Sequence, residues 1–307
     1  MAKEESAFLA QPELGAVLKI QSAIMGSARD FLSSSGFIEM LPVMLSTETD
    51  PLCHEVIDAK IPYYDTEYYL MKSMILHKLI AVSYVDKFFI FSPNIRLETA
   101  DKKDTGRHLI EFTQLDLEMR YADREQIMAL GEKLIAHTIR SIIEKCGHEL
   151  KLLGRKIAAP QTPFERITYA DAVKKFGPEF EHELSKEAKG PIWLTDIPIE
   201  RREFYDREDP KRPGILLDMD LIYPEGYGEA MSGGEREYEY SRIVQRITKS
   251  GKRPEDFKKY LELAKKGLPH SSGFGFGIER LTRYICGLES VKMARLFPKV
   301  PGAKSAL

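Results

Sequence analysis

Two arginines stand near the ends of a short polar segment, where they could bind phosphate. The segment "IRLETADKKDTGRHLIEF" (95–112) places Arg96 near its start and Arg107, followed by His108, near its end. Apolar residues flank it on both sides, so we expect a charged loop between two strands. A guanidinium donates hydrogen bonds in a fixed fork and stays charged, which suits it to phosphate. The same residues would also suit a solvent-exposed hairpin tip.

The strand that follows this loop is predicted to carry polar side chains on one face. In "HLIEFTQLDLEMRY", apolar residues occupy alternate positions, and strand side chains alternate between faces. The apolar set should face the core, and the other set combines an aromatic ring, an amide and two carboxylates. These four residues are Phe112, Gln114, Asp116 and Glu118. Simple solvent exposure of a half-buried antiparallel strand would give the same pattern.

Two carboxylates flank a turn further along the chain. In "DMDLIYPEGYGEAMSGGERE", Asp220 lies on a predicted strand and Glu229 follows the turn, with Ser232 three residues later. Such residues can converge on Mg²⁺, which prefers a few carboxylates together with nucleotide phosphates. A polar hairpin tip is the alternative interpretation.

A glycine-rich segment, "GFGFGIER", leads into a helix near the end of the chain. Its spacing is G-x-G-x-G and no acidic residue follows about 20 residues later, which argues against a Rossmann site. Alternating glycines, the last of them Gly277, leave one strand face without side chains, so a ligand or another backbone could approach. Arg280 follows at the start of the helix. Together with the preceding segments, this composition suggests a nucleoside triphosphate site without a P-loop, although a crowded packing site remains possible for the glycines.

The surrounding elements are predicted from periodicity. Apolar spacing predicts a helix over 12–35, Asp123 should cap a long helix, and Thr168 a short one. "FIEMLPVML" (37–45) is expected to form a strand interrupted by Pro42. Strands are separated by helices of varied length without regular alternation, which favours an α+β fold with a largely antiparallel sheet. We expect a single catalytic domain over 1–307, with a helical insertion around 147–190.

Composition excludes several classes of protein. The 307 residues are 43% hydrophobic and carry a net charge of −2, so no global basic field indicates nucleic-acid binding. Three scattered cysteines suggest reduced thiols. No signal-peptide core begins the chain, and no apolar run is long enough for a membrane span, so we expect a cytoplasmic protein.

These segments resemble class II aminoacyl-tRNA synthetases of the aspartyl/asparaginyl branch. "GFIEMLP" is similar to motif 1, "IRLE…GRHLIEFTQLDLEM" to motif 2, and "GFGFGIERL" with "GLESVKMARLFPK" to motif 3 and its tail. The resemblance extends through "PFERITYADAV", "LTDIPIERREFY" and "GEAMSGGERE", almost the whole chain. It implies a six- or seven-stranded antiparallel sheet flanked by helices, and a homodimer formed through Gly36–Pro42.

The resemblance also assigns roles to individual residues. ATP and Mg²⁺ would be bound, with Arg96 and Arg280 essential for catalysis. The ATP-binding set would be Arg96, Glu98, Arg107, His108, Phe112, Asp220, Glu229, Gly277 and Arg280. The metal ligands would be Asp220, Glu229 and Ser232. The substrate-binding set would be Glu48, Lys78, Asp116 and Arg236, and the Lys78–Arg236 pair favours aspartate over asparagine. Near Lys78, this chain has "KSMILHK" where members of the family usually have a glutamine-rich segment. This difference weakens the inference of amino-acid specificity from the resemblance.

The family's N-terminal anticodon-binding barrel has no counterpart in this sequence. We therefore expect a catalytic core resembling the archaeal asparagine synthetases related to asparaginyl-tRNA synthetase, in which ammonia attacks an aspartyl-adenylate to give asparagine and AMP. Aspartate would then bind reversed, so that its β-carboxylate is activated. One alternative is a truncated enzyme that transfers an activated amino acid to RNA or protein. The other is a non-catalytic regulator that retains the fold.

Overall fold

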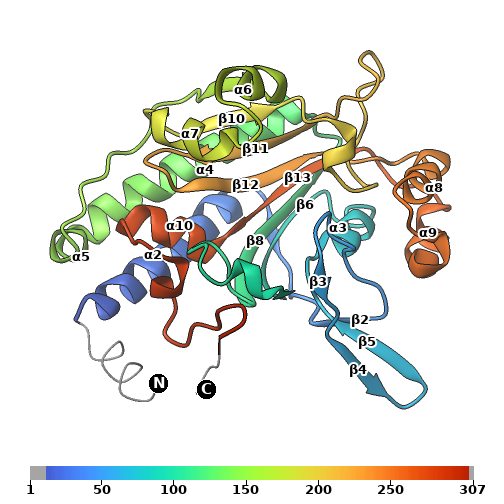
Figure 1. Ribbon diagram of the computed structural model, residues 1–307, viewed down its shortest axis with the longest axis horizontal. Helices are drawn as coiled ribbons and strands as arrows, with labels where there is room; N and C mark the ends of the chain where they lie inside the picture. The colour runs from blue at the N-terminus through green and yellow to red at the C-terminus, as the bar shows by residue number, and fades with distance from the viewer. Residues whose placement is uncertain (1–11, 304–307) are drawn as a thin grey trace.

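An eight-stranded sheet forms the centre of the computed structural model, which describes residues 12–303 (Figure 1). The strands in spatial order are β1 (Ile38–Glu39), β6 (Lys87–Ile95), β8 (Glu111–Arg120), β13 (Ser271–Gly277), β12 (Gly228–Glu235), β11 (Asp218–Tyr223), β10 (Ile192–Thr195) and β9 (Glu165–Thr168). The predicted α+β class is confirmed. The sheet is antiparallel at its centre, but β1–β6 and β9–β10 pair in parallel and bring the count above the predicted six or seven.

Helices flank this sheet. They are α2 (Pro12–Ser34), α3 (Ile75–Ala81), α4 (Arg124–Lys145), α5 (Gly147–Leu152), α6 (Tyr169–Phe176), α7 (Phe180–Glu187), α8 (Tyr240–Lys249), α9 (Lys258–Ala264) and α10 (Ile278–Cys286). Two small sheets stand apart, formed by β2 (Leu45–Ser46), β5 (Thr66–Leu70) and β4 (Lys60–Tyr63), and by β3 (Val56–Ile57) with β7 (Leu97–Glu98). Among residues 12–303, no helix is long and apolar enough to cross a membrane.

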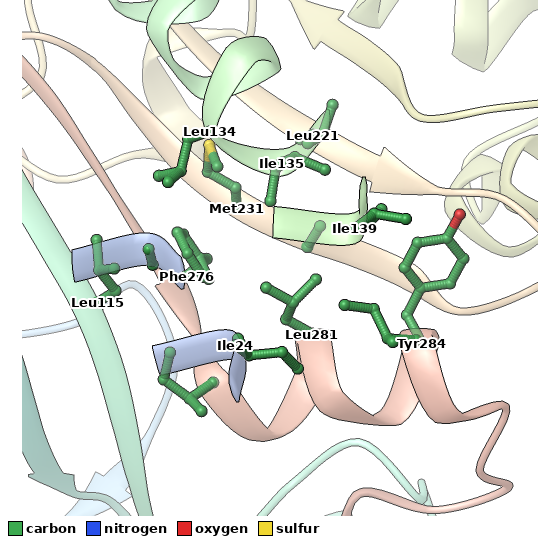
Figure 2. Packing of buried hydrophobic residues seen from close by; sticks show 14 of the residues in the cluster. Ile24, Leu115, Leu134, Ile135, Ile139, Leu221, Met231, Phe276, Leu281 and Tyr284 are labelled. Atoms are coloured by element: carbon green, nitrogen blue, oxygen red, sulfur yellow. The ribbon is translucent and has the colours of Figure 1, made fainter. Parts of the chain in front are cut away.

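The main core lies between one face of the sheet and the helices α2, α4 and α10. Figure 2 shows Ile24 from α2, Ile135 from α4 and Leu281 from α10 gathered around strand residues such as Leu115 and Phe276. All five residues are at most 2% exposed. The apolar parity predicted for β8 therefore faces this core, and its polar parity faces the other side of the sheet.

Capping residues begin two of these helices where the sequence predicts. The Asp123 side chain accepts a hydrogen bond from Gln126 N (2.8 Å), and the Gln126 side chain accepts one from Asp123 N (3.1 Å), which forms a capping box on α4. Thr168 accepts from Asp171 N (3.1 Å) at the start of α6. Each such cap stabilises a helix by about 1 kcal/mol.

Two segments differ from their predictions. Of "FIEMLPVML", only Ile38–Glu39 forms strand β1. The last hydrogen bond to β6 runs from Met40 N to Phe89 O (2.9 Å). Pro42, two residues later, has no N–H and could not continue the pairing. The segment 147–190, predicted as a helical insertion, holds α5, α6 and α7 but also β9, an edge strand of the central sheet. The start of the chain, where we predict no signal core, lies outside the described residues.

Candidate active site

A cavity of about 470 Å³ opens on the polar face of the sheet. Most of the residues predicted from the sequence line it, from both the nucleotide and the amino-acid sets. They are Lys78, Arg96, Glu98, Arg107, His108, Phe112, Asp116, Glu229, Ser232, Arg236, Gly277 and Arg280. They come from β6–β8, β12–β13, α3 and α10, so the antiparallel centre of the sheet brings distant sequence segments to one place.

The alternating glycines of β13 make room for carboxylates. Gly275 pairs with Asp116 and Gly273 with Glu118 across the β13–β8 ladder. A Cβ atom added at Gly275 would lie 2.6 Å from Asp116 Oδ1, and one at Gly273 would lie 2.1 Å from Glu118 Oε2. The predicted close approach is therefore present, and it accommodates the acidic side chains of the neighbouring strand.

Three arginines gather at one end of the cavity. Arg96 Nε donates to Lys72 O (3.0 Å), and its guanidinium lies 5.2 Å from the centre of the Phe112 ring. Arg107 contacts Glu181 Oε1 of α7 (2.7 Å), while Arg280 contacts Glu229 Oε1 (3.4 Å). Arg96 has no carboxylate partner among the described residues, and Arg107 and Arg280 have one each, so the cluster keeps a net positive charge that suits a polyanion.

The electrostatic effect of these arginines is visible on their neighbours. Burial raises the pKa of Glu229, but the guanidiniums of Arg280 and Arg107 outweigh it, and the pKa falls below its usual value. Burial, together with Arg280, lowers the pKa of His108 to about 4, so its imidazole is neutral at physiological pH. Its Nδ1 lies 2.7 Å from Thr105 Oγ1 within the loop.

A histidine that the sequence analysis did not single out holds the predicted adenine ligand Glu98. His54 Nε2 lies 3.2 Å from Glu98 Oε1, and both residues line the cavity. Hydrogen bonding to Cys53 and to Glu98 raises the pKa of His54 to about 9. His54 therefore carries a positive charge at neutral pH and holds Glu98 as a carboxylate.

The opposite end of the cavity holds a chain of buried ion pairs. Lys78 Nζ contacts Asp116 Oδ1 (2.9 Å) and lies 3.8 Å from Glu118 Oε2. Arg236 contacts Glu118 Oε1 (3.2 Å) and Asp206 Oδ1 (3.0 Å). All five residues are at most 5% exposed. Positive and negative side chains alternate along this series of ion pairs. The ammonium and carboxylate groups of a zwitterionic ligand could therefore each take the place of a side chain of the same charge.

The predicted metal ligands lie at one edge of the cavity. Asp220 and Ser232 are paired across the β11–β12 ladder. Glu229 and Ser232 line the cavity, whereas Asp220 does not. Arg202 Nη2 contacts Asp220 Oδ2 (2.5 Å), but Asp220 Oδ1 is buried without a hydrogen-bond partner among the described residues. A free carboxylate oxygen beside a hydroxyl and a second carboxylate fits Mg²⁺.

Glu48 is the one predicted substrate ligand that the structure places away from the cavity. Its carboxylate accepts hydrogen bonds from the backbone N–H groups of Lys259 (2.6 Å) and Tyr260 (2.9 Å), at the start of α9. Asp50, two residues later in "STETDP", lines the cavity instead. In an extended segment, residues two apart share a face, so the sequence supplied no means of choosing between them.

Three further charged residues of the cavity escaped the sequence analysis. Arg202, Glu203 and Asp206 lie in the irregular segment between β10 and β11, and all three line the cavity. The resemblance covers "LTDIPIERREFY" but assigned no role to these residues, and the density of charge in "IERREFYDRED" is also typical of a solvent-exposed loop.

Comparison with known proteins gives consistent matches. Residues 2–301 match the family described as tRNA synthetases class II (D, K and N). The asparagine–tRNA ligase of Thermococcus kodakarensis is 33% identical over 312 residues, which cover 95% of this chain and 71% of that protein. The asparagine–tRNA ligase of Pyrococcus abyssi is 31% identical, with 94% and 69% covered.

Solved structures agree with these matches. The asparaginyl-tRNA synthetase from Pyrococcus horikoshii, complexed with asparaginyl-adenylate, superposes with a TM-score of 0.88 at 30% identity, covering 96% of this chain and 70% of that one. The aspartyl-tRNA synthetase from Entamoeba histolytica gives a TM-score of 0.77 at 26% identity, with 94% and 59% covered.

Proposed function

Because this chain belongs to the class II tRNA synthetases of the D, K and N group, a family of ATP-dependent ligases, we propose that it activates aspartate with ATP and transfers it to ammonia. The first step would join an aspartate carboxylate to the α-phosphate and release pyrophosphate. The second would form asparagine and AMP. The observation that supports this proposal is the two-ended cavity, with arginines at one end and alternating buried ion pairs at the other.

The arginine end would bind the triphosphate. Arg96 would bind the α-phosphate, where negative charge accumulates in the transition state, and Arg107 and Arg280 would bind the remaining phosphates. Phe112 would stack on adenine, and the Glu98 carboxylate would accept a hydrogen bond from the adenine amino group. Gly277, which has no side chain, would leave space beside the adenine. Bound Mg²⁺, held by Asp220, Glu229 and Ser232, would neutralise phosphate charge.

The ion-paired end would bind the amino acid. The substrate ammonium group would replace Lys78 as the partner of Asp116, whose Oδ2 is buried and has no partner among residues 12–303. Lys78 and Arg236 would then bind the substrate α-carboxylate, which directs the β-carboxylate toward the α-phosphate. This exchange of partners keeps every buried charge compensated, as a low-dielectric site requires.

Transfer of asparagine or aspartate to tRNA is the second candidate function. It is favoured by the relatives, several of which are named asparagine–tRNA ligases and are 30 to 33% identical. The chain spans about 71% of the length of one of them. This candidate uses the same adenylate and differs only in the acceptor.

One assay separates the two candidates. Pure protein is incubated with ATP, Mg²⁺ and labelled aspartate, with and without ammonium, and then with labelled aspartate or asparagine and tRNA. We expect labelled asparagine and AMP only when ammonium is present. Label on RNA would support the second candidate, and AMP under no condition would refute both.

A further inference from the structure

Two carboxylates on one wall of the cavity, Asp50 and Glu203, have no part in the adenylation step described above, and they lie beside Asp206, the partner of Arg236. Asp50 precedes β3, and Glu203 and Asp206 lie between β10 and β11; all three line the cavity. Each residue is at most 5% exposed. We call these three residues the acidic wall. Tyr205, whose hydroxyl donates to Asp50 Oδ1 (3.1 Å), links its two segments.

Each residue of the acidic wall has one carboxylate oxygen with a polar partner, and Glu203 also has a buried one without a partner among the described residues. Asp206 contacts Arg236 (3.0 Å), and Glu203 Oε1 contacts Lys252 Nζ (3.0 Å). Glu203 Oε2 is buried and has no hydrogen-bond partner among residues 12–303. A buried carboxylate oxygen without a donor is unfavourable, because it has lost its hydrogen bonds to water and gained none in the protein. A ligand that donates a hydrogen bond at this position would remove that cost.

The charge balance around Glu203 favours a cation as that ligand. Asp50 and Asp206 face Glu203 with negative charge, and Lys252 is the cation that contacts its carboxylate. Arg246 approaches the same segment but donates to the backbone carbonyls of Glu203 and Asp206. The acidic wall is not a metal site, since no cluster of three or more His, Cys, Asp or Glu side chains within the described residues could hold a metal ion. A small nitrogen cation with several N–H donors fits better.

We propose that Glu203 binds the ammonium ion in the acidic wall and removes one of its protons. This inference rests on ammonia being the acceptor, as proposed above. Glu203 Oε2 takes a proton from NH₄⁺ and becomes a carboxylic acid, leaving NH₃ with a free electron pair. That pair attacks the acyl carbon of aspartyl-adenylate, the C–N bond forms, and the bond from carbon to the phosphate oxygen breaks. AMP leaves, and the new amide nitrogen loses one proton to solvent.

The surroundings of Glu203 suit it to accept this proton. Burial raises the pKa of Glu203, Lys252 opposes the rise, and Asp50 and Asp206 add to it. A base is most effective when its pKa lies near the working pH, and positioned general bases contribute about 10²–10⁴-fold. At neutral pH almost all ammonia is present as the ammonium ion, which has no free electron pair, so the reaction needs such a base.

The α-ammonium group of the amino-acid substrate has the same chemistry and could occupy the acidic wall instead. The two sources are separated by measuring each half-reaction of the variant Glu203→Gln. Aspartate-dependent exchange of pyrophosphate into ATP reports amino-acid binding and adenylation alone. Asparagine formation at varied ammonium concentration and pH reports the second step. Hydroxylamine, which is mostly neutral at pH 7, replaces ammonia without needing deprotonation.

We expect Glu203→Gln to retain pyrophosphate exchange and hydroxamate formation. Its KM for ammonium at pH 7 should rise at least about tenfold, and activity should recover as pH rises and free ammonia accumulates. Glu203→Asp should retain part of the ammonium-dependent rate. Glu262→Gln, on the exposed face of α9, is the matched control and should behave like the unmodified protein. Thermal unfolding of each variant verifies folding.

Two results would overturn the assignment. A rise in the KM for aspartate in the exchange reaction would show that Glu203 binds the substrate amino group. An unchanged ammonium dependence in a folded Glu203→Gln variant would show that the acidic wall takes no part. If the unmodified protein exchanges pyrophosphate but never forms asparagine, the proposed acceptor fails first, and the inference fails with it.

Discussion

At the scale of single residues, the site depends on charges whose partners differ at its two ends. Arg96 has no carboxylate partner among the described residues and Arg280 has one, Glu229, whereas Lys78 and Arg236 are each paired with two buried carboxylates. The first arrangement favours a polyanion and the second a zwitterion.

Removing an arginine from the phosphate end should abolish adenylation. We expect Arg96→Ala or Arg280→Ala to lower the rate of pyrophosphate exchange by at least about 10²–10³-fold, because each guanidinium opposes charge that develops in the transition state. Arg253→Ala is the matched control, since Arg253 is exposed and its guanidinium pairs with Asp256 in its own turn. Exchange that survived both substitutions would refute the assigned roles.

The half-buried His108 should make stability depend on mildly acidic pH. Its pKa is about 4 in the folded protein, held down by burial and Arg280, and about 6.5 when unfolded. The unfolded state therefore binds a proton first, and stability falls as pH drops from about 6.5 toward 4. Chemical denaturation at several pH values should show this slope, and a His108→Gln variant should show a shallower one. Equal slopes would contradict the assignment.

At the scale of elements, the β13 glycines connect the fold to the site. A methyl group at Gly275 would lie 2.6 Å from Asp116 Oδ1, so the Asp116 carboxylate would have to shift and disturb its buried ion pair with Lys78. We expect Gly275→Ala to destabilise the protein by about 1–3 kcal/mol and to impair adenylation. Gly15→Ala, in α2 with nothing within 4 Å of the added atom, should instead stabilise it by about 0.5–1 kcal/mol. Denaturation midpoints measure both, and a stable, active Gly275→Ala would contradict the packing argument.

Elements with strong local signals could be predicted from the sequence. The capping box of α4 and the alternation of β8 depend on neighbouring residues, and both are confirmed. The parallel edge pairs β1–β6 and β9–β10 depend on contacts distant in sequence, and no local pattern marks them. The choice between Glu48 and Asp50 likewise depends on where α9 packs, which the sequence does not show.

At the scale of the whole molecule, the segment Gly36–Pro42 is predicted to form a dimer interface. Ile38 is 59% exposed and Leu41 is 89% exposed, an unusual amount for apolar side chains close together at a sheet edge. We expect Leu41→Asp to shift the protein from dimer to monomer in sedimentation or light scattering. Leu152→Asp, at an exposed leucine in α5, is the control. A monomeric unmodified protein would contradict the prediction.

In the proposed reaction, the β-carboxylate of aspartate is joined to AMP before ammonia displaces it. Aspartate labelled with oxygen-18 in its β-carboxylate reports this bond, in a reaction with ATP, Mg²⁺ and ammonium. We predict that asparagine forms and that the AMP released carries one labelled oxygen, detected by mass spectrometry. Unlabelled AMP, or labelled AMP obtained only from aspartate labelled in the α-carboxylate, would contradict it.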